Sequence, residues 1–299
     1  MITTAELSAA GLTENRIKTL VRQRVLVPLC RGVYADAGFA GLTAQGRASE
    51  HVLRVAAAVT ITGPGAVGSH HIAAAIHGLD LLDRPRADLV PVSRPQDSHG
   101  SRTARPGIRV HTAALPARHV VVRLGVPVTS VARTVVDLAR TSSVRSGVVV
   151  ADSALHRGLT TKAELQSVIS ACAQWPGIRR ARQVVDFSDA LSESAFESIA
   201  RVVFSDEELP PPQLQVWVGG DSGAIGRADF LWRAHRTIGE ADGAVKYADP
   251  MRARKQLYRD AQLREAGFEV VHFTWQGLHS APGQVAASIR AAFSRGGTV

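Results

Sequence analysis

The sequence has little cysteine and no long hydrophobic run. Its 299 residues include only Cys30 and Cys172, which excludes a disulfide-rich scaffold or a cysteine-rich zinc site and is typical of a reducing compartment. The most apolar stretch, residues 52–61, is interrupted by Arg54, so we expect no membrane span and no membrane partner. The first residues lack a basic segment followed by an apolar core, so we expect no secretory signal. These absences predict a cytoplasmic protein.

Lysine is also scarce, with 4 lysines against 31 arginines, yet the chain has a net charge of +9 and a pI near 10.5. Such a charge is compatible with DNA as a partner, although an arginine-rich composition also follows from a GC-rich genome. The excess of positive charge lies before residue 190. Residues 190–299 contain one more acidic than basic side chain, so the charge alone does not assign nucleic-acid binding to that part.

Acidic side chains gather in the stretch Asp229–Lys246, which has the pattern of a β-hairpin. Two strand-like runs flank residues 234–235, where we expect the reversal. An antiparallel hairpin centred there pairs residues whose numbers sum to 469, so that Asp229 faces Glu240 with Cβ atoms about 5 Å apart. Asp242 falls on the same face by the strand period of two. Carboxylates this close repel each other unless a cation lies between them, so the hairpin predicts a metal site.

Helices are predicted on both sides of the hairpin. Ser194 and Glu197 have the spacing of a capping box at the start of an apolar stripe. A strand at residues 214–218 precedes the hairpin, and a second helix follows Pro250 and ends before Gly267. A buried strand then completes the order helix, strand, strand, strand, helix, strand.

The phrases S-A-F-E-S, R-A-D-F, G-E-A-D-G-A-V-K-Y and Y-R-D-A-Q-L-R-E-A-G-F resemble the domain related to very-short-patch-repair endonucleases, within the PD-(D/E)XK nuclease superfamily. The resemblance covers about the last hundred residues and implies a phosphodiesterase that uses Mg²⁺ or Mn²⁺. It implies metal binding by Glu197, Asp229 and Glu240, with Arg259 on a phosphate. Asp242 stands where the family has lysine, and Lys246 lies four residues further on. The catalytic residues implied are therefore Glu197, Asp229, Glu240, Asp242 and Lys246.

The N-terminus has the pattern of a winged helix-turn-helix. Thr3 begins a short helix that ends before Gly11, and Thr13 begins a second helix whose buried stripe includes Ile17. Two short strand-like runs follow. The side chains expected to meet DNA phosphates or base edges are Arg16, Lys18, Arg22, Arg24 and Arg31. The alternative is a solvated helical face, which a charge pattern of this kind often is.

The runs A-E-L-S-A-A-G-L-T to L-V-P-L-C-R-G-V-Y, S-H-H-I-A-A-A-I-H-G-L and V-T-S-V-A-R-T-V-V-D-L-A-R resemble the AbiEi antitoxins of type IV toxin-antitoxin systems. The resemblance covers roughly residues 1–160. It implies a winged helix that binds operator DNA and represses its own operon. It also implies a following domain that neutralises a nucleotidyltransferase-like toxin.

Two features of this middle region have a structural explanation. Arg133 and Asp137 are four residues apart and should form an ion pair across one helical turn. His70, His71 and His77 lack the spacing of a metal-binding helix, so we expect them to pack rather than to bind zinc.

The sequence thus predicts a multidomain α/β (α+β) protein. Its predicted parts are a winged helix-turn-helix at 1–40, an α+β middle domain at 41–188 and a nuclease-like mixed sheet flanked by helices at 189–299. We expect a DNA-binding protein with a Mg²⁺-dependent endonuclease-like domain that cuts or nicks DNA in defence or repair. The alternative is an antitoxin and transcriptional autorepressor whose last domain is inactive.

Overall fold

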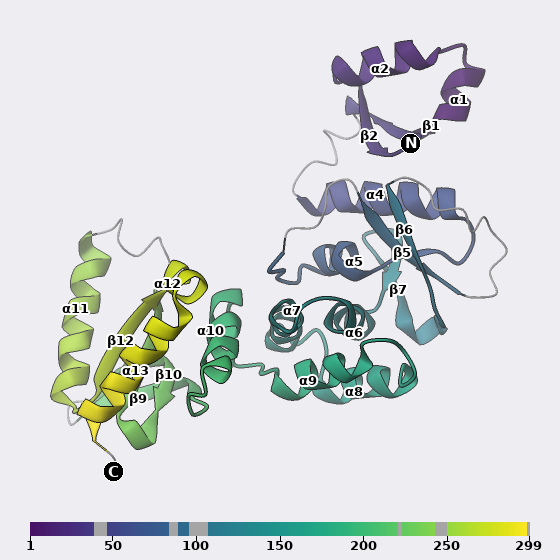
Figure 1. The fold of residues 1–299 in the computed structure, drawn as a ribbon. Coiled ribbons are helices and arrows are strands. Elements are labelled where there is room, and N and C mark those ends of the chain that lie inside the picture. Colours follow the sequence, from purple (N-terminus) through teal and green to yellow (C-terminus); the bar gives the residue numbers. More distant parts are fainter. Residues whose placement is uncertain (39–46, 84–88, 96–106, 221–222, 243–249, 298–299) are drawn as a thin grey trace. The chain divides into compact units, whose positions relative to one another are not determined.

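The structure, a computed structural model, describes all residues except 39–46, 84–88, 96–106, 221–222, 243–249 and 298–299 (Figure 1). The chain divides into two compact units, Met1–Phe187 and Ser188–Val299. Helices and strands are mixed in both units, and the described strands form three sheets. The multidomain α+β fold predicted from the sequence is confirmed, and the division between the units falls next to residue 188.

The N-terminal part of the first unit, residues 1–36, is called the head. It consists of a three-stranded sheet of order β1-β3-β2 with two helices between β1 and β2. Thr3 and Glu6 form a capping box on the first helix, and the Thr13 hydroxyl accepts the Arg16 N–H at the start of the second. Leu7 and Ile17 close the core beneath the helices. The elements are β1 (Ile2–Thr3), α1 (Thr4–Ala9), α2 (Glu14–Arg22), β2 (Leu26–Cys30) and β3 (Val33–Asp36).

Helix α4 (Arg47–Thr62) packs between the head and a five-stranded sheet (Figure 1). Ala57 contacts the core of the head, whereas Val55 and Ala58 contact the sheet and helix α5 (His70–His77). The sheet has the order β6-β5-β4-β8-β7, in which β5/β6 and β4/β8 are parallel. Its strands are β4 (Val67–Gly68), β5 (Val90–Arg94), β6 (Ile108–Thr112), β7 (Val120–Arg123) and β8 (Val126–Thr129), with the short helix η1 (Ala117–His119) before β7.

Four helices complete the first unit, and α6 contacts each of the other three. Val135, Val136 and Ala139 of α6 are fully buried, because neighbouring helices cover one side of α6 and α5 covers the other. The helices are α6 (Val131–Thr141), α7 (Val144–His156), α8 (Lys162–Ala171) and α9 (Ile178–Phe187).

The second unit is a four-stranded sheet of order β12-β11-β10-β9, with β11 and β12 parallel. Phe204, Phe230, Trp232 and Phe273 form an aromatic core, with ring centroids 5.2–5.6 Å from Phe204. The predicted element order is confirmed, and two further helices follow. The elements are α10 (Ala195–Asp206), β9 (Gln213–Gly220), β10 (Gly223–Trp232), η2 (Arg233–His235), β11 (Thr237–Asp242), α11 (Pro250–Glu265), β12 (Glu269–Thr274), α12 (Trp275–Ser280) and α13 (Pro282–Gly296).

Among the described residues, no helix combines the length and the apolar character that crossing a bilayer requires.

Candidate functional site

The hairpin of the second unit reverses where the sequence predicts, and its register is the predicted one. Phe230 pairs with Gly239 and Trp232 with Thr237, so the residue numbers of each pair sum to 469. The ladder ends at Phe230, one pair before the carboxylates. The Asp229 carboxylate instead accepts a hydrogen bond from the Ala241 N–H at 3.0 Å. Asp229 therefore replaces a backbone acceptor between the two strands.

Glu240 is paired with an arginine. The Arg259 guanidinium on α11 lies 2.9 Å and 3.5 Å from the two carboxylate oxygens, and it also donates to the Arg227 carbonyl at 2.6 Å. The Glu240 side chain is only 3% exposed. A Cβ at Gly226 would lie 2.4 Å from Nε of Arg259, so glycine is what leaves room for the guanidinium. The sequence predicts a phosphate contact for Arg259, whereas the structure places this side chain on Glu240.

Glu197 is held at the start of α10 by the capping interaction that its spacing predicts. Its carboxylate accepts hydrogen bonds from the Ser194 hydroxyl, the Glu193 N–H and the Gln215 amide, at 2.8–3.0 Å. Burial raises the pKa of the Glu197 carboxyl above its ordinary value, and the negative charge of Asp229 raises it further. Glu197 and Asp229 are thus close enough to interact electrostatically.

Asp242 belongs to a separate set of contacts on α11 and β12. One of its carboxylate oxygens accepts a hydrogen bond from the Gln256 amide at 3.2 Å, and the other lies 3.1 Å from Nδ1 of His272. Nε2 of His272 lies 2.7 Å from the carboxylate of the buried Asp260. Lys246, which the nuclease resemblance implies as a catalytic residue, lies outside the described residues.

The described acids do not form a ready site for a divalent ion. Both oxygens of Glu240 face Arg259, those of Glu197 accept three hydrogen bonds, and Asp242 faces His272. No group of three or more His, Cys, Asp or Glu side chains in the described ranges is arranged to hold a metal. Mg²⁺ takes oxygen ligands, so an ion at Glu240 requires Arg259 to leave. We therefore derive no catalytic step through a metal.

The cationic side chains of the head are all exposed. Arg16, Lys18 and Arg22 project from α2, while Arg24 and Arg31 flank β2. The burial of Ile17 fixes the rotation of α2, so that these side chains face solvent. Lys18 forms an ion pair with Glu14 at 2.8 Å, and both side chains are more than half exposed. An exposed pair of this kind is weak, so Lys18 remains available to a phosphate.

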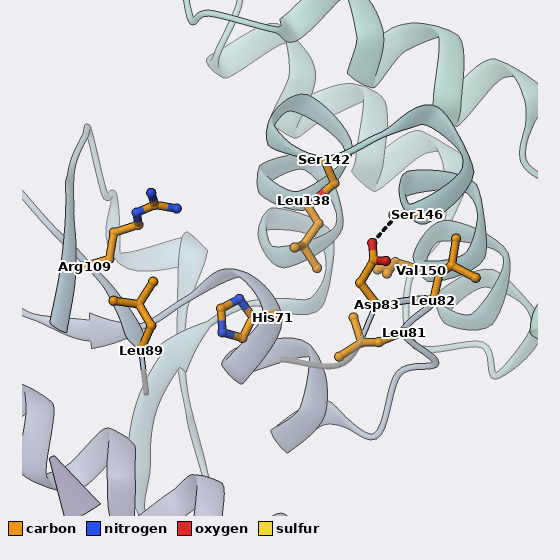
Figure 2. A pocket seen from close by; sticks show the side chains of 10 residues that line it. All are labelled: His71, Leu81, Leu82, Asp83, Leu89, Arg109, Leu138, Ser142, Ser146 and Val150. Carbon is orange, nitrogen blue, oxygen red and sulfur yellow. Dashed lines mark hydrogen bonds between the residues drawn. The ribbon is translucent and has the colours of Figure 1, made fainter. Parts of the chain in front are cut away.

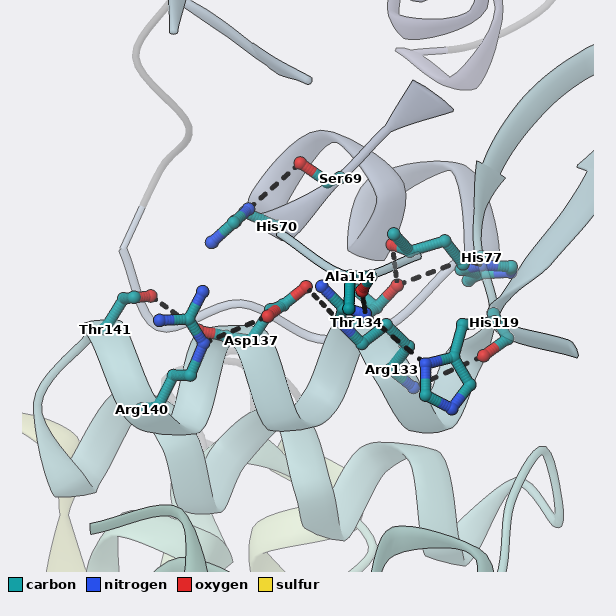
Figure 3. Close-up of polar contacts among 12 residues, drawn as sticks. Ser69, His70, His77, Ala114, His119, Arg133, Thr134, Asp137, Arg140 and Thr141 are labelled. Carbon is teal, nitrogen blue, oxygen red and sulfur yellow. Dashed lines mark hydrogen bonds and ion pairs between the residues drawn. The ribbon is translucent and has the colours of Figure 1, made fainter. Parts of the chain in front are cut away.

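Two motifs of the middle region, the first at residues 69–79 and the second at residues 128–140, meet in a buried polar network (Figure 3). Arg133 donates to Asp137 at 2.8 Å, as the sequence predicts, and Arg140 donates to the other Asp137 oxygen at 3.0 Å. Both guanidinium groups lie over the Trp175 ring, 4.5 and 5.0 Å from its centroid. His77 joins the first motif to the second through the Thr129 carbonyl, at 2.8 Å. This network holds α5, β8 and α6 together.

The other histidines of the first motif are buried or partly buried beside the network. His70 stacks on His111 of β6, with ring centroids 3.9 Å apart. Burial lowers the pKa of His70 well below its ordinary value and lowers the pKa of His111 to about 4. Neutral rings packed in this way match the expected structural role, because a protonated pair would place two positive charges in contact.

A pocket of about 210 Å³ opens between α5, β6, α6 and α7 (Figure 2). His71 and Arg109 lie on one side of it, and Leu138 and Val150 supply apolar wall. On the other side, the Ser146 hydroxyl donates to the Asp83 carboxylate at 2.7 Å. The pocket therefore combines an apolar wall with one cationic and one anionic side chain.

Some residues at these sites carry no usable sequence signal. Gln215, in β9, donates to the Glu197 carboxylate and has a left-handed φ of +53°. Nothing in the sequence marks this residue, because a glutamine in a strand is common. The Arg259–Glu240 pair joins two elements, so no helical spacing indicates it. Asp260 was detectable only through its spacing of four from Gln256 on one face of α11.

Comparison with known proteins finds a family match in the middle region. Residues 66–187 match the family described as the AbiEi antitoxin C-terminal domain. Two curated relatives, uncharacterized proteins of Mycobacterium tuberculosis strains CDC 1551 / Oshkosh and ATCC 25618 / H37Rv, are each 28% identical over 291 residues. The alignment covers 93% of this chain and 96% of each relative, so the similarity extends across both compact units. The antitoxin resemblance is confirmed for the middle region, and the nuclease resemblance stays a prediction.

Proposed function

We propose that this chain is a DNA-binding regulator of the antitoxin type, in which the head binds operator DNA. The observation that carries the proposal is the arrangement of the head in front of the matched segment 66–187. The head, in which two capped helices are inserted into a three-stranded sheet, exposes five cationic side chains, three of them on α2. In helix-turn-helix proteins the second helix enters the major groove, and here that helix is α2.

The chemistry of α2 fits this role. Arg16, Lys18 and Arg22 offer charged donors for phosphates or for the edge of guanine, while Arg24 and Arg31 extend the positive surface beside β2. Phosphate contacts release counterions, so affinity should fall steeply as salt rises. Contacts to base edges would add the sequence specificity that an autorepressor needs.

The test is binding to the DNA upstream of the gene, measured by fluorescence anisotropy at several salt concentrations. Lys18→Ala combined with Arg22→Ala should weaken binding and lower the slope of log K against log salt by about 2, since each phosphate contact contributes about 0.9. Arg179→Ala combined with Arg182→Ala removes two exposed charges from α9 and is the matched control. Equal loss in both double variants would refute a DNA site on α2.

A toxin partner follows from the family match rather than from a single contact. We propose that the segment 66–187 neutralises a nucleotidyltransferase-like toxin. The experiment is co-expression with a toxin of that class encoded beside the gene, which should restore growth. Growth arrest that persists despite soluble, DNA-binding protein would exclude this partner.

A second candidate function is endonuclease activity in the second unit. The observation that favours it is the electrostatic interaction between Glu197 and Asp229, because a buried acid whose pKa is raised partly by a second acid on another element is unusual without a functional reason. Purified protein with Mg²⁺ or Mn²⁺ should then nick supercoiled plasmid, and Asp229→Ala or Glu240→Ala should abolish the nicking. Wild-type protein that is inert on duplex, mismatched and single-stranded DNA would leave regulation as the function.

A further inference from the structure

Strand β7 is an edge of the five-stranded sheet, and its only neighbouring strand among the described residues is β8. Pro127 of β8 lies opposite Val122, and proline has no N–H to donate. Val122 therefore occupies a non-hydrogen-bonded position toward β8, and its N–H and C=O point to the open edge. Val120, two residues earlier, has the same orientation.

The side chains at this edge are unusually apolar for a solvated surface. Val122 is 74% exposed and Leu124 is 58% exposed. Exposed edge strands that carry large apolar side chains are ready templates for pairing with another chain, and soluble proteins ordinarily avoid them with charges or proline. The apolar side chains therefore indicate that something covers this edge.

The hairpin turn requires a positive φ at Leu124, and this backbone conformation is strained for a leucine. With Gly125 it forms the two-residue turn between β7 and β8, with φ of +51° and +80°. Turns of this type favour asparagine, aspartate or glycine at the first position, because a bulky side chain resists a positive φ. Because Leu124 is exposed, its side chain adds little packing energy within its own chain to offset the cost of the positive φ.

A hollow beside the same edge can receive an apolar side chain. It has a volume of about 750 Å³ and is lined mainly by apolar residues, among them Val59, Val67, Leu115, Val120 and Pro127. Val120 and Val122 point to the same face of the sheet, because side chains alternate along a strand. A strand that pairs with β7 would therefore present its own side chains to this hollow.

We propose that the occupant is a second copy of this chain, paired antiparallel through β7. Val122 would lie opposite its own counterpart, so the outward N–H and C=O groups of both strands are satisfied. In this register Leu124 of the second copy lies opposite Val120, at the hollow. Arg123 lies opposite Val121 and not opposite the other Arg123, so no like charges face each other.

The association should be weak without DNA. One short strand pair and two leucines in hollows bury less than the roughly 1,200 Å² of a stable standard interface. Two copies nevertheless supply two heads, which suits the paired half-sites that helix-turn-helix proteins bind. The inference itself rests only on the first unit and is tested without DNA.

Sedimentation-equilibrium ultracentrifugation of the full chain, from about 1 µM to about 1 mM, covers the range of weak dimers. Wild type should dimerise, whereas Val122→Lys and Leu124→Asn should stay monomeric. Leu124→Asn relieves the strained turn, so its thermal midpoint should equal or exceed that of wild type. The thermal midpoint of Leu124→Asn therefore distinguishes loss of the interface from loss of folding.

Leu159→Asn changes another exposed leucine of the same unit and should leave dimerisation intact. Wild type that is monomeric throughout the concentration range overturns the proposal and leaves the edge to a different protein. Unchanged dimerisation of Val122→Lys and Leu124→Asn, or equal loss in Leu159→Asn, overturns the assignment to β7.

Discussion

A charge buried in the first unit gives the sharpest prediction at the scale of single residues. The side chains of Arg133 and Asp137 are at most 1% exposed, and Asp137 also binds Arg140. Replacing Asp137 with alanine leaves Arg133 buried without its counter-charge, which typically costs about 3–5 kcal/mol. Asp137→Ala should lower the free energy of unfolding of the first unit by that amount, as measured by urea denaturation followed by circular dichroism.

The matched control is the exposed ion pair between Glu14 and Lys18. Glu14→Gln should leave the free energy of unfolding nearly unchanged, because solvent screens an exposed pair. If both variants lose the same stability, burial does not determine the strength of these ion pairs.

The stacked histidines make the first unit sensitive to acid. In the unfolded chain His70 and His111 titrate near about 6.5. In the folded chain burial lowers the pKa of His111 to about 4 and that of His70 well below its ordinary value. Between these values the unfolded state binds more protons, so stability is full above about pH 6.5 and is lost as pH falls toward 4.

His111→Gln should therefore flatten the dependence of stability on pH. Each such histidine contributes up to about 1.4 kcal/mol per pH unit within its window, and the variant removes one of them. Urea denaturation between pH 4.5 and 7 measures the slope, with the exposed His279→Gln as control. An unchanged slope in His111→Gln would show that His111 is protonated in the folded protein.

At the scale of elements, the contact between α11 and the hairpin determines whether the acids are open to a cation. Arg259→Ala removes the cation from Glu240, whose side chain is 3% exposed. A divalent ion could then supply the missing charge, and a ligand at one hundred times its Kd stabilises by about 2.7 kcal/mol. Mn²⁺ should raise the thermal midpoint of Arg259→Ala but not that of wild type.

Lys255→Ala, on the same helix, removes an exposed cation and should show no response to Mn²⁺. The double variant Arg259→Ala, Asp229→Ala tests whether Asp229 shares the ion. A midpoint for Arg259→Ala that is insensitive to Mn²⁺ would mean that the acids are built for arginine alone.

The same hairpin shows what a sequence can and cannot predict. Capping and turn signals are local, so the caps at Thr3 and Thr13 and the register of β10 and β11 were predictable. The partner of Glu240 was not, because Arg259 reaches it from another element through the space that Gly226 leaves. The sequence thus predicted the hairpin that carries the acidic side chains but not the partner that neutralises each of them.

At the scale of the whole molecule, charge and structure separate the two units. The five exposed cations of the head belong to Met1–Phe187, whereas residues 190–299 contain one more acidic than basic side chain. Each unit also has its own core, with Ile72 and Val128 in the first and Phe204 and Phe230 in the second. Each should therefore fold when produced without the other.

Separate production of residues 1–187 and 188–299 then tests where DNA binding resides. The first fragment should bind the upstream DNA within about threefold of the full chain, with the same salt slope, because the phosphate contacts all lie in the head. The second should fold cooperatively but bind weakly, since its acidic and basic side chains nearly balance and leave no net positive charge to attract the phosphates. Anisotropy measures affinity, and circular dichroism confirms folding. A folded second fragment that binds as tightly as the full chain would move the DNA site from the head to the acidic hairpin unit.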